Sequence, residues 1–466
     1  MAKVSALAAL VVATGCGGGD EKVVCNPAAQ TGCGGGQVCE AVPGATAACF
    51  DPVILAGTVT DLATARGLAG ARLVALDANR APASAVATSA EDGTYRVALP
   101  WPRAADGTPL PGSVTLRADR AGYQGFPGGL RQALPVDLSS PARLQGSWSV
   151  RSALTDVGLV ALPAGAGTGA IHGKLTPPAD GAGVLVVAET SSGGALHGAS
   201  AVADRGGDFA ILNLAAGEYT VRAYAKGASY GPATVALAAG QDAPVQLGAP
   251  AAATGTVSGS VQIVNGGQGT TTSVVLVVES TFEAALARGD VPPGLRASGV
   301  TGSFSVAGVP EGRYVALAAF EDDRLVRDPD TSIGGTQIAH VTVSNGATVP
   351  VAAFKVTGAL DVIAPGATGP EAITSPTPLL SWADDSSEDH YRVTVLDAFG
   401  STLWELTIPG VSGGTPSVRY GQAGGTPATA PALAPGMYYQ FRVASLKSGV
   451  PISTTEDLKG VFQYAP

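Results

Sequence analysis

The stretch Leu55-Ala-Gly57-Thr-Val59 recurs as Ile171-His-Gly173-Lys-Leu175 and again as Val257-Ser-Gly259-Ser-Val261, so one pattern, apolar-x-Gly-x-apolar, occurs three times in the 466 residues. Alternation of apolar with other residues is typical of a β-strand that buries one face. A second apolar segment follows each stretch, at residues 73–76, 184–187 and 274–278. A pattern that returns in this way predicts a repeated β unit.

Each unit continues with a Gly turn and an aromatic strand: Gly93-Thr-Tyr95, Gly207-Asp-Phe209 and Gly302-Ser-Phe304. The second and third units close with another tyrosine, Tyr219 or Tyr314, ten residues after the phenylalanine. Side chains that alternate along strands place these aromatic rings on one face, where they fill the core between two sheets. We therefore predict an all-β chain of tandem β-sandwich domains.

The first unit resembles a carboxypeptidase regulatory-like domain, a transthyretin-like sandwich. The residues that carry the resemblance are Gly57-Thr-Val-Thr-Asp61, Gly70-Ala71-x-Leu73 and Thr88-x3-Asp92-Gly93-x-Tyr95. The second and third units keep the strand skeleton, although Asp-Gly-x-Tyr has become Gly-Asp-Phe and Gly-Ser-Phe there. The resemblance implies three such domains, at 53–162, 168–250 and 254–358.

Residues 359–466 follow another pattern. They contain Pro376-Thr-Pro-Leu-Leu-Ser-Trp382 and later Leu433-Ala-Pro435-Gly436-Met-Tyr-Tyr439. This segment resembles a fibronectin type III or immunoglobulin-like sandwich. The resemblance implies that Trp382 packs in the core and that Tyr439 hydrogen-bonds back to the corner backbone. With four sandwiches in sequence, we expect a rod or short string of domains.

One helix is expected within the third unit. Ser280-Thr-Phe-Glu283 has the form of a capping box, residues 284–288 favour helix, and Gly289 is a residue that can end it.

The N-terminus has the pattern of an export signal. Lys3 precedes an uncharged run at residues 4–12, which is too short for a permanent transmembrane helix, and Ala13-Thr14-Gly15-Cys16 follows. These four residues resemble the lipobox of bacterial lipoproteins, with Ala13 where that family most often has Leu. The resemblance implies a signal peptide at 1–15 and a lipid on Cys16 that anchors the protein in a membrane. Gly17, in place of Asp, favours the outer membrane. The alternative is an ordinary secretory signal with a chance cysteine.

The other four cysteines lie in the segment 16–52, which we interpret as a Cys-rich tether between the lipid and the first domain. They are Cys25, Cys33, Cys39 and Cys49. An even number in a short Gly-rich segment of an exported protein predicts two disulfides, with three pairings open. A zinc site is the alternative, but the segment lacks Cys-x-x-Cys spacing and any histidine.

Composition and motifs exclude several functions. The net charge of −10 and the lack of a Lys/Arg cluster argue against nucleic-acid binding. The four histidines are scattered, and no hydrolase elbow, P-loop or dinucleotide motif occurs in its required setting. We therefore expect no enzyme, no catalytic residue, no metal and no cofactor.

Two features are candidates for binding. Residues 321–330 hold five carboxylates and two arginines, which is either a Ca²⁺ site or a solvated loop with internal ion pairs, and Asp384-Asp385…Glu388-Asp389 is similar. Trp101, flanked by prolines in a loop inserted after Leu99, either stacks on a sugar or lies buried under that loop.

The expected function is that of an outer-membrane lipoprotein that acts as a structural or adhesive scaffold. The alternatives are a polysaccharide-binding surface protein and an accessory subunit of an envelope or secretion complex, with a polysaccharide or another envelope protein as partner.

Overall fold

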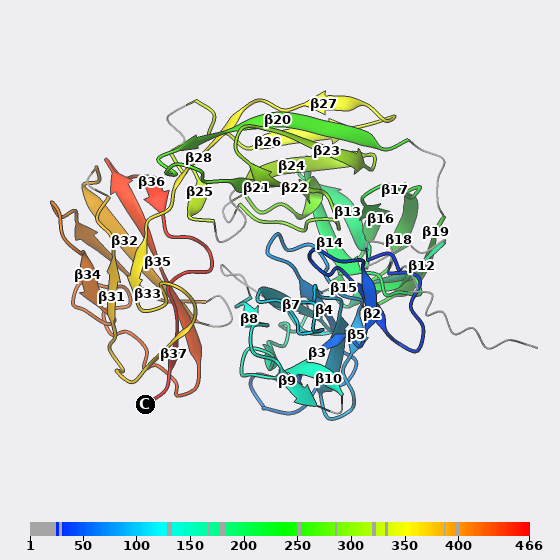
Figure 1. The fold of residues 1–466 in the computed structure, drawn as a ribbon, viewed down its shortest axis with the longest axis horizontal. Coiled ribbons are helices and arrows are strands. Elements are labelled where there is room, and N and C mark those ends of the chain that lie inside the picture. Colours follow the sequence, from blue (N-terminus) through cyan, green and yellow to red (C-terminus); the bar gives the residue numbers. More distant parts are fainter. Residues whose placement is uncertain are drawn as a thin grey trace, which may run out of the picture.

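The computed structural model describes residues 25–27, 30–127, 133–144, 146–165, 167–176, 183–248, 253–284, 287–318, 323–330, 334–385, 387–397 and 401–466. Within these residues the regular elements are strands, apart from one 3-10 helix, Glu279–Thr281. The strands form tandem β-sandwiches behind a small N-terminal hairpin, as the sequence predicts (Figure 1). The hairpin pairs β1 (Val38–Glu40) with β2 (Ala48–Phe50).

The first sandwich has two sheets over one apolar core. One sheet contains β3 (Val53–Asp61), β6 (Thr94–Leu99), β9 (Ala142–Leu144), β10 (Ser147–Val150) and β11 (Val157–Leu159). The other contains β4 (Arg72–Leu76), β5 (Ala87–Thr88), β7 (Ser113–Asp119) and β8 (Val136–Asp137).

The second sandwich repeats this plan. Its first sheet is β12 (Gly169–Thr176), β15 (Asp208–Leu214) and β19 (Asp242–Gly248). Its second sheet is β13 (Leu185–Ser192), β14 (Ala195–Val202), β16 (Gly217–Ala225), β17 (Ala228–Ser229) and β18 (Ala233–Leu237).

The third sandwich follows the same plan with different edge strands. One sheet is β20 (Gly255–Val264), β23 (Ser303–Val309), β25 (Leu325–Arg327), β27 (Thr348–Pro350) and β28 (Phe354–Gly358). The facing sheet is β21 (Thr272–Val278), β22 (Arg296–Val300), β24 (Gly312–Ala318) and β26 (Ala339–Val343).

The repeated strand pattern has a structural basis. In all three sandwiches the first strand pairs antiparallel with the aromatic strand and parallel with a late strand. The glycine of each first strand lies directly opposite the aromatic residue: Gly57 opposite Tyr95, Gly173 opposite Phe209 and Gly259 opposite Phe304. A Cβ on any of these glycines would lie within 3.0 Å of the facing ring or its hydroxyl. A backbone carbonyl also approaches each glycine, from Thr155, Val245 and Val351 respectively. The facing ring and this carbonyl together leave no room for a side chain, which explains why glycine recurs at the position.

The closing tyrosines also occupy equivalent positions. Tyr219 and Tyr314 are buried, and each hydroxyl donates a 2.9 Å hydrogen bond to the carbonyl four residues earlier, of Ala215 and Pro310. This bond satisfies the hydroxyl inside the core.

The fourth sandwich has a different topology. Its sheets are β29 (Val362–Ala364), β31 (Leu379–Trp382) and β34 (Ser417–Arg419), and β30 (Glu371–Ile373), β32 (His390–Asp397), β33 (Thr402–Pro409), β35 (Tyr438–Lys447), β36 (Val450–Thr454) and β37 (Val461–Tyr464). Trp382 is fully buried, and its ring packs edge-on against Tyr391 at 5.3 Å between centroids. The Tyr439 hydroxyl accepts a 2.7 Å hydrogen bond from the Ala434 backbone N–H. Both sequence-based expectations for these residues are confirmed.

The prediction of a helix after residue 280 is wrong. The chain makes the 3-10 turn Glu279–Thr281, and Glu283 and Arg288 then pair as an antiparallel bridge. Ser280, the predicted cap residue, donates instead to Glu189 of the second sandwich at 2.9 Å. The tertiary contact of this side chain outweighs the local helix signal, because a short capping motif contributes only about 1 kcal/mol. Residues 285–286 lie outside the described residues.

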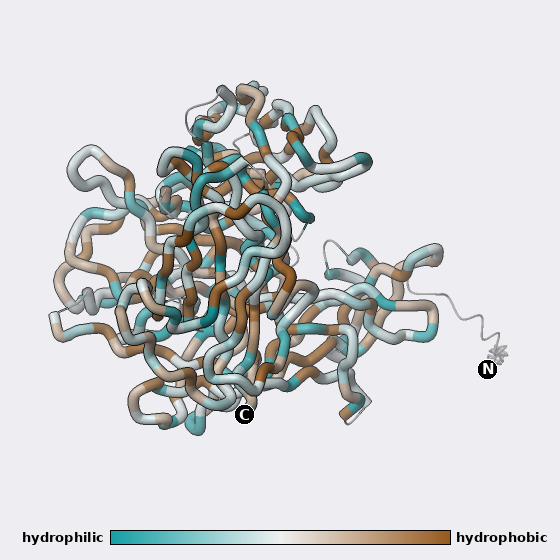
Figure 2. The backbone as a smooth tube through the Cα atoms, turned by 90° about the vertical axis from the view of Figure 1, so that its left-hand side faces the viewer, coloured by the Kyte–Doolittle hydropathy of each residue, from teal (hydrophilic) through white to brown (hydrophobic). Residues whose placement is uncertain are grey.

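The expected rod or string is also wrong. The core of the third sandwich includes Leu185, Val187 and Tyr224 of the second, and Val74 and Leu76 of the first pack on Val202 of the second. Figure 1 shows the third and fourth sandwiches beside the first two instead of in a row. In Figure 2 brown, hydrophobic stretches of the tube gather in the interior of this body, where they alternate with paler ones. Apolar faces between domains are buried, so a compact arrangement is favoured over a linear one.

Candidate functional site

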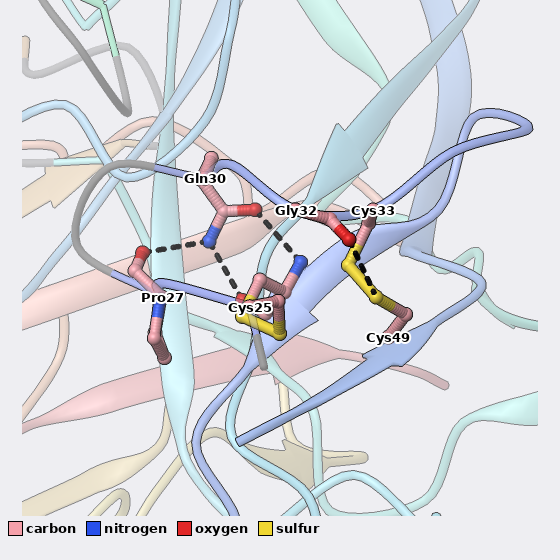
Figure 3. Close-up of a disulfide and its surroundings, with 7 residues drawn as sticks. Cys25, Pro27, Gln30, Gly32, Cys33 and Cys49 are labelled. Atoms are coloured by element: carbon pink, nitrogen blue, oxygen red, sulfur yellow. Dashed lines mark hydrogen bonds between the residues drawn. A yellow bond between two sulfur atoms is a disulfide. The ribbon is translucent and has the colours of Figure 1, made fainter. Parts of the chain in front are cut away.

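The N-terminal segment forms a disulfide-bonded knot. Cys25 is bonded to Cys39 and Cys33 to Cys49, which selects one of the three pairings left open by the sequence (Figure 3). Gln30 ties the two ends together, since its amide donates to the Pro27 and Cys39 carbonyls at 2.8 Å and accepts from the Cys39 N–H. The segment has few apolar residues, so crosslinks and these hydrogen bonds supply its order.

The knot is attached to the first sandwich and does not stand apart from it as a spacer. The Arg103 guanidinium donates to the Asp51 carbonyl at 2.7 Å and lies over the Phe50 ring at 5.4 Å. The Arg103 backbone N–H donates to the Ala41 carbonyl at 3.0 Å. Arg103 is 1 % exposed, so the loop that carries it clamps the knot against the domain.

A buried carboxyl faces this arginine. Glu40 is 3 % exposed, and burial raises its pKa from 4.5 to about 7, while the Trp101 backbone N–H and the charge of Arg103 act in the opposite direction. Burial without a full set of hydrogen bonds disfavours the charged form. Glu40 and Arg103 were missed by sequence reasoning, because neither belongs to a motif and their proximity depends on how the knot folds.

Trp101 lies in the inserted loop, and the structure gives its ring several contacts. Its indole N–H donates to the Leu110 carbonyl at 2.8 Å, and a Cβ on Gly112 would lie 2.5 Å from the ring. Trp148 is similar: its N–H donates to the Gly107 carbonyl at 3.2 Å. Both indoles are half-buried and stabilise the loop. Part of the Trp101 surface remains exposed, and a sugar contact there stays a prediction.

A polar junction joins three sandwiches around one arginine. Arg117 on β7 binds Asp119 with two donors, at 2.7 and 3.2 Å, and its Nη2 donates to the Ser200 carbonyl of β14 at 2.7 Å. Its Nη1 donates to the Ser200 hydroxyl at 2.9 Å and lies 3.5 Å from Asp290 of the third sandwich. All five guanidinium donors are therefore used.

The carboxylate of Asp290 belongs to the same junction. This carboxylate accepts a hydrogen bond from the Ser200 hydroxyl. The backbone N–H of Asp290 donates a hydrogen bond to the Thr281 hydroxyl at 2.9 Å. Burial acts to raise the pKa of Asp290, but the positive charges of Arg117 and Arg80 outweigh it and lower that pKa. The junction thus holds three domains through a desolvated, hydrogen-bonded ion pair.

The acidic segments use their carboxylates internally where they are described. Asp323 and Asp328 accept from backbone N–H groups of Leu325 and Asp330 at 3.1 and 3.0 Å. Asp384 accepts from the Tyr391 hydroxyl and the Gly413 N–H, both at 2.9 Å. Glu321 and Asp322 lie outside the described residues. These bonds are those of ordered loops, and a Ca²⁺ site stays a prediction.

Three of the four histidines each meet a carboxylate at a separate place. His172 pairs with Asp242, His340 with Glu279 and His390 with Asp389, at 2.7, 2.6 and 2.9 Å. Among the described residues, the one group of three metal-ligand atoms that lie close together is Cys25, Cys33 and Cys39, and their sulfurs are in the disulfides. In this form the sulfurs are not thiolates, the form that binds zinc.

A mostly apolar cavity of about 360 Å³ lies where the first and fourth sandwiches meet. Its walls include Leu62, Leu116 and Phe126 on one side and Met437 and Tyr438 on the other. Two domains thus pack here incompletely.

Among the described residues, none of the helices has the length and the hydropathy that a transmembrane span requires. The signal peptide at 1–15, Cys16 and Gly17 lie outside the described residues.

No protein-family model matches the chain, and no curated protein matches it. Solved structures that align with it include the Bacillus anthracis TIE protein, at 11% identity over 85% of this chain and 66% of that one, with a TM-score of 0.15. A Streptococcal ancillary pilin aligns at 12% identity over 65% and 99%, with a TM-score of 0.15. A DUF3823 family protein from Parabacteroides merdae aligns at 15% identity over 46% and 99%, with a TM-score of 0.20. TM-scores this low do not establish a shared fold, so the assignment of β-sandwiches is based on the strands and cores of this chain itself.

Proposed function

We propose that this chain is a lipid-anchored envelope protein, attached through Cys16 to the outer membrane, that acts as a non-catalytic structural or adhesive scaffold. Its first three sandwiches would be transthyretin-like domains and its fourth a fibronectin type III-like domain. The observation that carries the proposal is the disulfide-bonded knot at residues 25–49, clamped on the first sandwich by Arg103. Paired disulfides are typical of an oxidising compartment.

The position of the knot, between Cys16 and the first sandwich, affects how far the sandwiches would lie from the membrane. Eight residues separate Cys16 from Cys25 in the sequence, and the knot is packed against the body. A lipid on Cys16 would therefore hold the sandwiches close to the membrane surface. The Arg117 junction supports the same role, since it makes three sandwiches one body that can bear load as a unit.

The anchor is tested by a Cys16→Ala variant compared with the native chain in fractionated cells. Several acyl chains bind a membrane stably because each buried methylene contributes about 0.8 kcal/mol. We expect the variant to move to the soluble fraction or to remain unprocessed. If it is cleaved correctly and still fractionates wholly with membranes, the proposal is wrong. Protease added to intact cells then reports which membrane face displays the sandwiches.

A second candidate is a polysaccharide-binding surface protein, which the half-exposed Trp101 favours. Retention of the full chain on a panel of immobilised glycans tests it, with Trp101→Phe as the variant that keeps a ring but loses the indole N–H. Binding that is lost in Trp101→Ala and kept in Trp101→Phe would assign the sugar contact to this ring. A scaffold that serves an envelope or secretion complex would instead yield a co-purifying protein after mild crosslinking.

A further inference from the structure

Two arginines flank a small residue on the outer face of the first sandwich. Arg96 on β6 is the register partner of Ala56 on β3. On the other side of β3, Val150 of β10 is the partner of Leu55, so the next residue, Arg151, is level with Ala56. Leu55, Val150 and the neighbours of Arg96 point into the core. Because side chains alternate along strands, Arg96 and Arg151 project from the opposite, outer face.

The spacing allows both guanidinium groups to reach one ligand. Neighbouring strands are about 4.8 Å apart, so the two arginine backbones, separated by β3, are about 10 Å apart. Long flexible side chains at that distance can converge above Ala56, where a methyl group leaves the space open. Arg96 and Arg151 are exposed. Neither guanidinium has a hydrogen bond or ion pair with another described residue.

The arginines border a groove of about 540 Å³. Its walls combine alanines with threonines: Ala56, Ala87, Ala90, Thr88 and Thr94. Two aspartates close to the groove in sequence bind threonines beside it and do not line it. Asp156 accepts from the Thr58 N–H and hydroxyl at 2.8 and 2.7 Å, and Asp92 accepts from the Thr94 N–H and hydroxyl at 2.9 and 2.7 Å. The two charged side chains that line the groove itself are both arginines, on a chain whose net charge is −10.

We propose that this groove binds the carboxylate of an acidic, hydroxyl-rich polysaccharide such as a polyuronate. The arginine fork matches a planar carboxylate with paired hydrogen bonds. At the rim, the Thr88 hydroxyl can donate to or accept from a sugar hydroxyl, the Thr94 hydroxyl can accept from one, and the alanines admit a flat ring.

Charge density separates this ligand from nucleic acid. Duplex DNA carries one negative charge per about 1.7 Å, and its binding needs several phosphate contacts. Two arginines on a strongly acidic protein do not meet that demand. A polyuronate has one carboxylate per sugar ring, so a single pair of arginines neutralises the unit that occupies the groove.

The test uses the full chain in mild detergent and titration calorimetry with oligogalacturonate, neutral dextran and inorganic phosphate. Arg96→Ala and Arg151→Ala are the test variants, and Arg392→Ala, an exposed arginine on β32, is the matched control. We expect oligogalacturonate to bind, each test variant to weaken it about tenfold or more, and the control to leave it unchanged, because a charge-assisted hydrogen bond contributes at least that much. Binding should also weaken as salt rises.

Three results would overturn the proposal: no binding of oligogalacturonate at low salt, equal loss in the Arg392→Ala control, or dextran or phosphate binding as tightly as the uronate. The test variants should keep the native thermal unfolding curve, since both side chains are exposed and lack partners among the described residues. The inference does not depend on the lipid anchor. Failure of the titration with normal membrane fractionation removes the groove alone, and failure of the Cys16→Ala test leaves the groove in place.

Discussion

Gly259 and Phe304 face each other across strands β20 and β23, and a Cβ on Gly259 would lie 2.9 Å from two atoms of the phenylalanine ring. The same glycine–aromatic relationship occurs at Gly57 with Tyr95 and at Gly173 with Phe209. The ring crosses the place that a side chain on the partner strand would occupy. In each of the three sandwiches this ring thus packs flat on the first strand inside the core.

The first prediction concerns this contact. Gly259→Ala should lower the free energy of unfolding by about 2–3 kcal/mol, because the new methyl group also lies 3.0 Å from the Val351 carbonyl oxygen and one neighbour must move. Gly302→Ala is the control in the same sandwich, where a Cβ meets no atom within 4 Å. It should change the stability by less than about 0.5 kcal/mol. Urea unfolding measures both, and equal effects would show that the facing ring is not the cause.

The second prediction concerns the three-way junction. Arg117→Met leaves Asp290 and Asp119 without their cation in a site where the side chains are 24% and 23% exposed, so the stability should fall by about 3 kcal/mol. Small-angle scattering should show a larger radius of gyration, because the first sandwich loses polar contacts to both neighbours.

Two variants control this experiment. Lys174→Met removes a half-exposed pair with Asp208 and should cost less than about 1 kcal/mol. Adding Asp290→Asn to Arg117→Met should recover part of the loss, since the unpaired charge is then gone. A single variant as stable and compact as the native chain would mean that apolar contacts alone hold the domains together.

The third prediction is a pH dependence of the knot. Because burial raises the pKa of Glu40 from 4.5 to about 7, the folded chain keeps a proton in this interval that the unfolded chain has released. The contribution of Glu40 to stability therefore falls as pH rises from about 4.5 to 7, by up to about 3 kcal/mol. Carboxyls with a lowered pKa, such as Asp290, act in the opposite sense, because their stabilisation is lost as pH falls.

Glu40→Gln isolates this contribution. The difference in thermal stability between Glu40→Gln and the native chain should grow in favour of the variant between pH 4.5 and 7.5. Glu218→Gln, which removes an exposed carboxyl at the start of β16, is the control for the loss of one negative charge. A constant difference between Glu40→Gln and the native chain over this pH range would contradict a raised pKa.

Much of the fold was predictable from local sequence. The alternation in 55–59, 171–175 and 257–261 predicts strands, and the structure has β3, β12 and β20 there. The buried Trp382 and the Tyr439 corner follow equally from short patterns. These features depend on the side-chain period of a strand and on fixed turn chemistry, which neighbouring residues determine. The prediction of a helix after Ser280 was wrong, because the Ser280 hydroxyl, the expected cap, donates a hydrogen bond to Glu189 of another domain.

The sequence by itself determined the strands, the number of cysteines available for bonding and the scarcity of catalytic motifs, because each depends on composition or on residues close together in the chain. Tertiary structure alone decided the cysteine pairing, the compact packing of the sandwiches, the burial of Glu40 beside Arg103 and the meeting of Arg117 with Asp290. It also placed Arg96 and Arg151 on the two sides of Ala56. These relationships join residues up to 173 positions apart. They depend on strand register and on the burial of apolar faces between domains, which no local pattern specifies.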